Sequence, residues 1–210
     1  WMIHRMDPPV DPDRRHPPER YQLVQPGPGP APRGRAQGWA IESFWPGLRC
    51  VLVSSEGVVD LLAQGRDPVT AHFPEVRTIG RALGATEVAL DGVVTAAGGG
   101  RDRLERRLAA GSDSTRRRLA RDEPVSFVAF DLLWQDGHPT TAEPWHERRR
   151  RLEELALEGP AWTTPSALTH DIPAVLTAAA RAGADRLVAK RTGAPYEPEA
   201  DPPAWRIVTP

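Results

Sequence analysis

Lysine is almost missing from this chain. Lys190 is the only lysine among 27 basic residues, so all the others are arginines. An arginine side chain stays protonated and cannot act as a nucleophile, whereas a neutral lysine amine can. Any covalent chemistry that needs an amine is therefore restricted to one side chain.

Cysteine and histidine are also too few or too scattered to form the usual sites. Cys50 is the single cysteine, which excludes an internal disulfide, and we expect it to be a small buried hydrophobe. The six histidines lack the spacing of metal ligands. A zinc site is therefore not expected. The histidines are His4, His16, His72, His138, His146 and His170.

The chain lacks long apolar runs and a strong net charge. No stretch approaches the roughly 18 apolar residues of a membrane span, and the N-terminus has no signal-peptide core. The net charge of -1 excludes a general basic field. With 210 residues, 40% of them hydrophobic and 26% charged, the composition is typical of a globular protein with a real core. We expect a cytoplasmic protein with no membrane partner.

Residues 1–37 are rich in proline, with the stretches "DPPVDPDRRHPPER" and "QPGPGPAPRGR". Proline fixes φ and removes a backbone donor, so this region is predicted to be an extended linker without helix or sheet. The first residue is Trp1, and "WMIHRMD" is interpreted as the possible last strand of a preceding domain.

From residue 38 onward, short strands alternate with helices, which predicts an α+β domain with a largely antiparallel sheet. The dipeptides Pro46-Gly47 and Asp91-Gly92 are predicted to form tight turns between antiparallel strands. The expected strands are 39–45, 49–54, 58–62, 87–90, 93–96, 125–133, 186–190 and 204–208, and the expected helices are "FPEVRTIGRALG", "RDRLERRLAAG", "PWHERRRRLEELALEG" and "HDIPAVLTAAARAG".

Ordered motifs connect these elements to one family. The stretches "ESFWPGLR", "EVALDGVV", "FVAFDLLW", "DRLVAKR" and "PAWRIV" occur in this order. Together they resemble the sequential motifs of the adenylation domain of ATP-dependent DNA ligases, particularly the bacterial end-joining type. The resemblance implies a ligase-type nucleotidyltransferase fold, ATP-grasp-like, with mainly antiparallel sheets and flanking helices over residues 38–210. It also implies that residues 1–37 link this domain to an upstream phosphoesterase-like domain.

The resemblance implies a chemistry as well. In the family, a lysine attacks the α-phosphorus of ATP to give a lysyl-AMP, which is passed to a DNA 5′-phosphate. Carboxylates hold ribose and a divalent metal such as Mg²⁺, and lysines on the last strand offset phosphate charge. The family's DNA-clamping oligonucleotide-binding barrel would follow Pro210, so none is expected within this chain, and we do not expect the chain alone to seal nicks.

Several reactive positions of the family are replaced here. Phe44 stands at the nucleophile position, and Pro46 replaces the aspartate of the following turn. Val93 replaces a glutamate, Asp185-Arg186 stand where Glu-Gly is expected, and both lysines of the last motif are missing. A phenyl ring has no nucleophile, so we predict that the chain has lost catalysis and that Phe44 and Trp45 fill the nucleotide pocket.

Other ligand-facing positions match the family. The resemblance assigns Glu42 to the adenine edge, Arg49 to the ribose, Phe130 to base stacking and Lys190 to a phosphate. Arg49 also suits a paired strand residue and Phe130 a core residue. Asp185 is the candidate metal ligand.

Arginine clusters are candidate DNA contacts. Arg116, Arg117 and Arg118, before the third strand motif, are the preferred candidates, and the cluster at 101–107 is another. The cluster at 148–151 has acidic neighbours at helical spacing, which favours a solvated, salt-bridged face.

Three functions remain open from the sequence. The first is an inactive ligase-family domain that binds DNA ends, other end-joining proteins or fused domains. The second is an active enzyme that uses Lys190 as a displaced nucleophile, or bound ATP without covalent chemistry. The third is a pseudoenzyme that senses ATP through Glu42, Arg49, Phe130 and Lys190.

Overall fold

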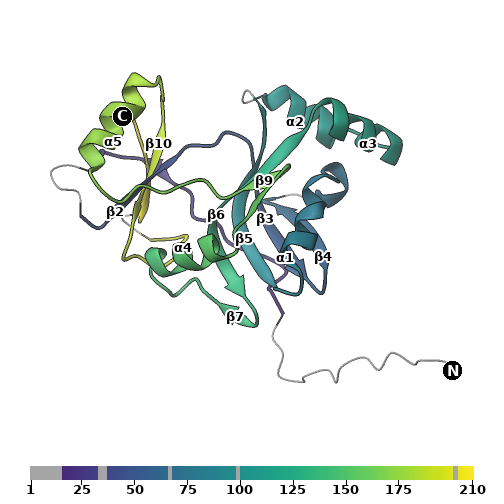
Figure 1. Cartoon of the computed structure of the whole chain (residues 1–210), viewed down its shortest axis with the longest axis horizontal. Helices are drawn as coiled ribbons and strands as arrows, with labels where there is room; N and C mark the ends of the chain where they lie inside the picture. Colours follow the sequence, from purple (N-terminus) through teal and green to yellow (C-terminus); the bar gives the residue numbers. More distant parts are fainter. Residues whose placement is uncertain (1–15, 33–36, 66–67, 98–99, 201–202) are drawn as a thin grey trace.

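The computed structural model describes residues 16–32, 37–65, 68–97, 100–200 and 203–210. Figure 1 shows one end of the molecule with β2, β10 and α5, the other end with β3, β5 and α1 to α3, and α4 between them. The strands are β1 (Gly27–Pro28), β2 (Trp39–Ser43), β3 (Leu48–Ser55), β4 (Val58–Ala63), β5 (Val88–Ala96), β6 (Val125–Gln135), β7 (His138–Pro139), β8 (Glu158–Gly159), β9 (Trp162–Thr163), β10 (Leu187–Arg191) and β11 (Trp205–Val208), and the α-helices are α1 (Ile79–Leu83), α2 (Arg101–Leu108), α3 (Asp113–Asp122), α4 (Trp145–Glu154) and α5 (Ile172–Arg181).

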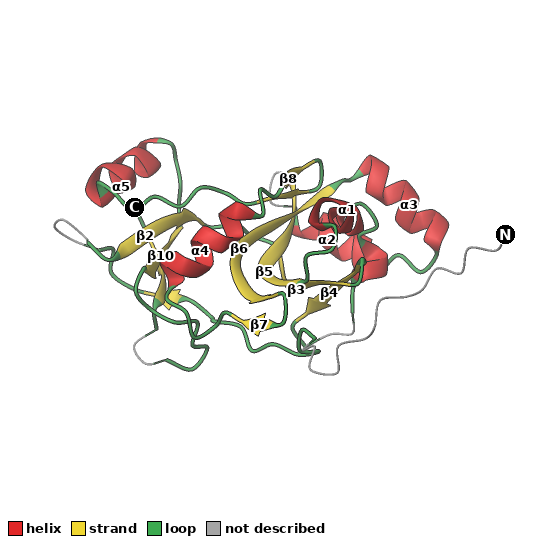
Figure 2. Ribbon diagram, turned by 60° about the horizontal axis from the view of Figure 1, so that its bottom comes forward, coloured by secondary structure: helices red, strands yellow, loops and turns green. Residues whose placement is uncertain are grey.

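The strands form two sheets. The four-stranded sheet has the order β1-β11-β10-β2, and the seven-stranded sheet has the order β4-β3-β5-β6-β9-β8 with β7 beside β6. Most pairs are antiparallel, while β1 runs parallel to β11 and β6 parallel to β9. The predicted α+β class with mainly antiparallel sheets and flanking helices is confirmed (Figure 2).

The predicted hairpin around Pro46-Gly47 is wrong. Strand β2 pairs with β10, whereas β3 pairs with β4 and β5, so the dipeptide carries the chain from one sheet to the other. A Cβ on Gly47 would lie 2.3 Å from the carbonyl oxygen of Val94. Glycine is needed here because the crossing segment packs directly on β5. Strand β5 also contacts this segment through a hydrogen bond of 2.8 Å that Thr95 Oγ1 donates to the Pro46 carbonyl.

The predicted turn at Asp91-Gly92 is also wrong, because both residues lie inside one continuous strand, β5. The register between β5 and β6 shifts on either side of Asp91. A Cβ on Gly92 would lie 2.4 Å from the Phe127 ring, so this glycine permits close packing between neighbouring strands. The two expected strands at 87–90 and 93–96 are therefore one element.

The four predicted helices occur, with one shortened. Residues of "FPEVRTIGRALG" form a 3₁₀ turn, Val76–Thr78, followed by the short helix α1, which ends at Gly84 with φ 61°. A further helix, α3 (Asp113–Asp122), is not among the four predicted ones, and its N-cap is Ser112, whose side chain accepts a hydrogen bond from the Thr115 backbone amide.

The described part of the proline-rich segment packs on the domain, contrary to the expectation of an extended linker without sheet pairing. Leu23 and Val24 are buried in a core cluster with Tyr196 and Trp205. Gly27 and Pro28 pair with β11, which is possible because an edge strand tolerates proline. We call residues 21–29 the N-terminal strap. The phosphoesterase-like "WMIHRMD" lies outside the described residues.

Three clusters of buried side chains stabilise the arrangement. The largest lies between the seven-stranded sheet and helices α1 and α2. A second joins the strap to the two sheets, and a third packs α5 against β2 and β10. In the part of the chain that the structure describes, no helix has the length and apolar character required to cross a membrane.

Candidate functional site between the two sheets

A small cavity lies where the two sheets face each other. Alternation along the strands turns Glu42, Lys190 and Trp205 toward this space, and Arg49 and Phe130 approach it from the seven-stranded sheet. The cavity has a volume of about 50 Å³. Its lining consists of Pro26, Glu42, Ser43, Phe44, Trp45, Arg49, Phe130, Val188, Lys190 and Trp205. The four predicted nucleotide-site residues are thus brought together.

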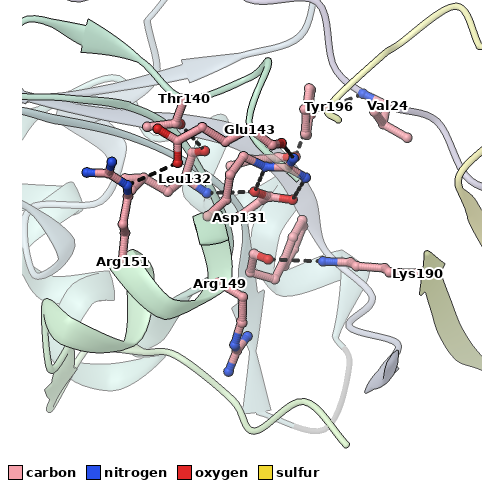
Figure 3. Close-up of polar contacts among 12 residues, drawn as sticks. Val24, Asp131, Leu132, Thr140, Glu143, Arg149, Arg151, Lys190 and Tyr196 are labelled. Carbon is pink, nitrogen blue, oxygen red and sulfur yellow. Dashed lines mark hydrogen bonds and ion pairs between the residues drawn. The ribbon is translucent and has the colours of Figure 1, made fainter. Parts of the chain in front are cut away.

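Lys190 is fully engaged by its surroundings. Its Nζ lies 2.8 Å from Glu42 Oε2 and donates a hydrogen bond of 3.0 Å to the Phe130 carbonyl. The same nitrogen lies 3.9 Å from the centre of the Trp205 ring, a cation–π contact. Figure 3 shows the amine reaching from its strand toward the carbonyl on β6.

Burial acts on both partners of this pair. It lowers the pKa of Lys190, while the charge of Glu42 opposes that shift. Burial raises the pKa of Glu42, while Lys190 opposes it. Because desolvation penalises each charged form, the pair is pushed toward neutrality.

Glu42 is incompletely satisfied. Among the described residues, its buried Oε1 has no hydrogen-bond partner, and neither has Arg149 Nη1, which lies 3.9 Å from it. The remaining nitrogens of Arg149 are used elsewhere, by Glu153 and by the Pro165 carbonyl.

Arg49 is held by Asp91. Two hydrogen bonds of 2.6 Å join Nε and Nη2 of the guanidinium to the two carboxylate oxygens. Burial opposes the charge of Arg49, but the ion pair with Asp91 outweighs it and keeps the pKa of Arg49 above its ordinary value. The Tyr196 hydroxyl donates a further 2.6 Å hydrogen bond to Asp91, and Val24 donates its backbone N–H to that hydroxyl. The guanidinium stacks 4.7 Å from the Phe130 ring centre.

Asp131 and Arg148 form a second buried pair that the sequence did not reveal. Arg148 donates from Nε and Nη2 to the two Asp131 oxygens at 2.7 and 3.0 Å, and Nη1 donates to the carbonyls of Glu143 and Ala194. Figure 3 shows Asp131 in the same group of polar contacts as Tyr196 and Lys190.

The interpretation of 148–151 as a solvated face is therefore wrong for half of the cluster. Arg148 and Arg149 are buried, whereas Arg150 is exposed and pairs with Glu147 and Glu154 as expected. The burial of Arg148 could have been predicted from helical spacing. Trp145, Arg148 and Leu152 are three and four residues apart, so they share one face of α4, and all three are buried.

The preferred DNA candidates lie on α3. Arg116 pairs with Asp113 at 3.0 Å and donates to the Ala110 carbonyl, and Arg118 pairs with Asp122 at 3.3 Å. Within the described residues, Arg117 alone of the three has no ion pair. Figure 1 shows α3 at the opposite end of the molecule from α5 and β10.

A sequence model described as "ATP dependent DNA ligase domain" matches residues 33–206. The chain belongs to this family. The resemblance predicted from the ordered motifs is thereby confirmed.

Curated relatives agree with this family. The multifunctional non-homologous end joining DNA repair protein LigD of Mycobacterium tuberculosis is 31% identical over 173 residues, which cover 81% of this chain and 21% of the relative. The LigD of Mycolicibacterium smegmatis is 27% identical over 206 residues, covering 98% of this chain and 25% of the relative. The chain thus spans about a quarter or less of the length of these relatives.

Solved ligase structures share the fold. A mycobacterial DNA ligase D complexed with ATP and MES superposes with a TM-score of 0.68 at 26% identity, covering 95% of this chain and 62% of that one. The ligase domain of M. tuberculosis LigD gives 0.67 at 27% identity, covering 95% and 60%. The chain is therefore an adenylation domain of the bacterial end-joining ligase type.

The family's nucleotide and metal suit this cleft poorly. A cavity of about 50 Å³ compares with roughly 300–1,000 Å³ for ligand pockets. Asp185, the candidate metal ligand, has a side chain 85% exposed and lies beside Arg186. Within the described ranges, no three His, Cys, Asp or Glu side chains gather so as to hold a metal ion. A single carboxylate holds Mg²⁺ weakly.

Phe44 lies at the end of β2, where the motif comparison places the family's nucleophile. Its ring lines the cavity, and the guanidinium of Arg186 stacks 4.2 Å from the ring centre. Trp45 lines the same cavity.

Proposed function

We propose that this ligase-family domain takes part in DNA end joining without forming a lysyl-AMP, and that it serves as a module that binds DNA ends beside other end-joining proteins or fused domains. The observation that supports this proposal is the small size of the cavity between the sheets. Phe44 and Trp45 line this cavity, whose volume is about 50 Å³.

The contacts of the retained residues support the same proposal. Arg49 gives Nε and Nη2 to Asp91, and Nη2 also donates to the Val24 carbonyl at 3.4 Å, so the bidentate edge of its guanidinium is occupied by protein groups. Lys190 is 1% exposed and is bound by Glu42, the Phe130 carbonyl and the Trp205 ring. The four residues assigned to a nucleotide now stabilise one another.

One observation favours the alternative in which Lys190 is a displaced nucleophile. Burial lowers the pKa of Lys190, and a neutral amine is what attack on phosphorus requires. Attack also requires an approach of about 3–3.5 Å in line with the leaving group. The amine instead faces Glu42, a carbonyl and an indole ring, which leave no such approach.

Intact-mass analysis after incubation with ATP and Mg²⁺ or Mn²⁺ tests the loss of self-adenylation. We expect no added AMP on the wild-type protein, on Lys190→Ala or on Phe44→Lys, because restoring the amine does not restore the cleft or the metal ligands. An adduct on the wild type that disappears in Lys190→Ala would make Lys190 the nucleophile. An adduct on Phe44→Lys alone would show that one substitution removed catalysis.

Two binding measurements complete the test. Equilibrium dialysis with ATP should show no saturable binding, with the mycobacterial DNA ligase D solved in complex with ATP as the positive control. Saturable ATP binding would support the nucleotide-sensing alternative. Fluorescence anisotropy with a 5′-phosphorylated duplex should show salt-dependent binding, and absence of binding at low salt would contradict the DNA-binding role.

A further inference from the structure

The face of the four-stranded sheet that packs against α5 also carries two arginines that have no ion pair among the described residues. Strand alternation turns Lys190 and Trp205 inward, so their neighbours Arg191 and Arg206 face outward. Neither guanidinium forms an ion pair or donates a hydrogen bond to any residue in the described ranges. By contrast, Arg49, Arg107 and Arg148 are each neutralised by a carboxylate.

Both guanidiniums are fixed on one aromatic ring. The Cζ atoms of Arg191 and Arg206 lie 4.6 and 4.8 Å from the centre of the Trp39 ring. The two charges therefore lie no farther apart than roughly one Debye length at 0.1 M salt, about 10 Å. A guanidinium stacked on an aromatic face keeps its N–H edge available to acceptors.

The backbone also holds these side chains in place. Arg191 is paired with Trp39 across β10 and β2, and Arg206 is paired with Ala189 across β11 and β10. The stem of Arg206 occupies the space beside Gly29, where a Cβ would lie 2.9 Å from Cδ. Two like charges so close together cost free energy that a bound anion would recover.

We propose that Arg191 and Arg206, stacked on Trp39, form a phosphate-binding site for the backbone of DNA. Two guanidinium forks on rigid strands match the geometry of phosphate oxygens. The inference rests on the proposed function only in naming DNA as the source of the phosphate. It places the contact on the sheet face that packs against α5, opposite the cavity between the sheets.

The test compares matched pairs of substitutions. Arg191→Gln with Arg206→Gln should weaken binding of a short 5′-phosphorylated duplex at least tenfold, and should reduce the slope of log Kd against log salt by about 1.8. Arg77→Gln with Arg81→Gln removes two exposed arginines that have no ion pair in the described residues, and should change Kd less than twofold. If both double variants lost the same affinity for the duplex, the loss would come from the change in net charge, and the proposed site would be overturned.

A second pair of variants separates geometry from charge. Arg191→Lys with Arg206→Lys keeps both charges, so it should keep most of the salt slope while losing affinity, because an ammonium lacks the planar fork. Full affinity in this variant would overturn a fork-specific site. Urea unfolding of each variant should stay close to the wild type, since Arg77, Arg81 and Arg191 are exposed and glutamine or lysine keeps most of the stem of the half-buried Arg206.

A readout at the arginines distinguishes failure of the site from failure of DNA binding. Inorganic phosphate and the duplex are titrated separately while the Nε–Hε resonances of Arg191 and Arg206 are followed by NMR. Saturable shifts with both probes support the proposal. Shifts with phosphate but not with DNA overturn DNA as the ligand, and shifts with neither overturn the site, whether or not the duplex binds elsewhere.

Discussion

Two buried carboxylates, Asp131 and Glu42, are solvated by protein in different ways. Asp131 receives two hydrogen bonds from Arg148 and one from the Leu132 amide, so both oxygens are satisfied. Glu42 has one oxygen on Lys190 and leaves the other without a hydrogen bond, 3.9 Å from Arg149. A rigid arginine fork satisfies a carboxylate in a way that a lysine ammonium cannot.

The two pairs also differ in the elements and residues that surround them. The Asp131 pair joins β6 to α4 and has the geometry of a permanent support. The Glu42 pair lies among residues that the family resemblance assigns to a nucleotide, and it satisfies only one of the two carboxylate oxygens within the described residues.

Breaking the well-satisfied pair should have the largest effect. Arg148→Met leaves Asp131 buried and unpaired, so we expect the free energy of unfolding to fall by about 3–5 kcal/mol. Urea denaturation measures it. Arg150→Met on the same helix is the control, because exposed pairs contribute about 0–1 kcal/mol. Similar losses in the two variants would contradict a special role for Asp131.

Breaking the imperfect pair should cost less and should depend on pH. Lys190→Met is expected to lose about 2–3 kcal/mol at pH 8, because Arg149 still lies near Glu42. A carboxyl whose folded pKa is raised favours folding at low pH, and this advantage is lost as pH rises from 4.5 through the raised value. The loss in Lys190→Met should therefore shrink toward pH 4.5.

Glu42→Gln provides the control for that profile. Glutamine does not ionise, so the double variant Glu42→Gln with Lys190→Met should lose this pH dependence. Urea unfolding between pH 4.5 and 8 measures both profiles, and an unchanged slope in the double variant would show that another group produces it.

The hydroxyl that connects Asp91 to the strap should have an intermediate effect. Tyr196→Phe removes the hydrogen bond to Asp91 and the acceptor for the Val24 amide. We expect a loss of about 1–2 kcal/mol, since each hydrogen bond contributes about 0.5–1.5 kcal/mol net. Thermal unfolding measures this loss, and a change below the error of the measurement would mean that water replaces both partners.

The smallest effect is expected at the other tyrosine. The Tyr21 hydroxyl is buried and has no hydrogen-bond partner in the described part of the chain, and burial raises the pKa of Tyr21. Tyr21→Phe removes an unsatisfied polar atom, so stability should stay within about 0.5 kcal/mol or rise. A clear loss in the same thermal assay would show that this hydroxyl has a partner in solution.

The sequence predicted the types of element better than their partners. The spacing of hydrophobic residues and the local composition located the strands near 125–133 and 186–190, because both can be read within a short window of sequence. Glycine at Gly47 and Gly92 was mistaken for turn chemistry, since the same residue also permits two backbones to pack closely. That choice depends on a neighbouring strand, which no short window contains.

The site was predictable only through the resemblance. Ordered motifs brought Glu42, Arg49 and Lys190 to one cleft, and the structure does place them together. The capture of Arg49 by Asp91 could not be foreseen, because Asp91 was assigned to a turn. Burial of Arg148 was missed because its partner, Asp131, lies on a different element.

The pairing of β1 with β11 has a consequence for the order of folding. The four-stranded sheet takes two strands from before residue 44 and two from after residue 186, whereas the seven-stranded sheet is built entirely from the residues between them. Contacts between distant parts of a chain form late, because closing a long loop costs entropy before any pairing compensates it. The central sheet should therefore assemble first, and the smaller sheet should close over it in the last kinetic phase.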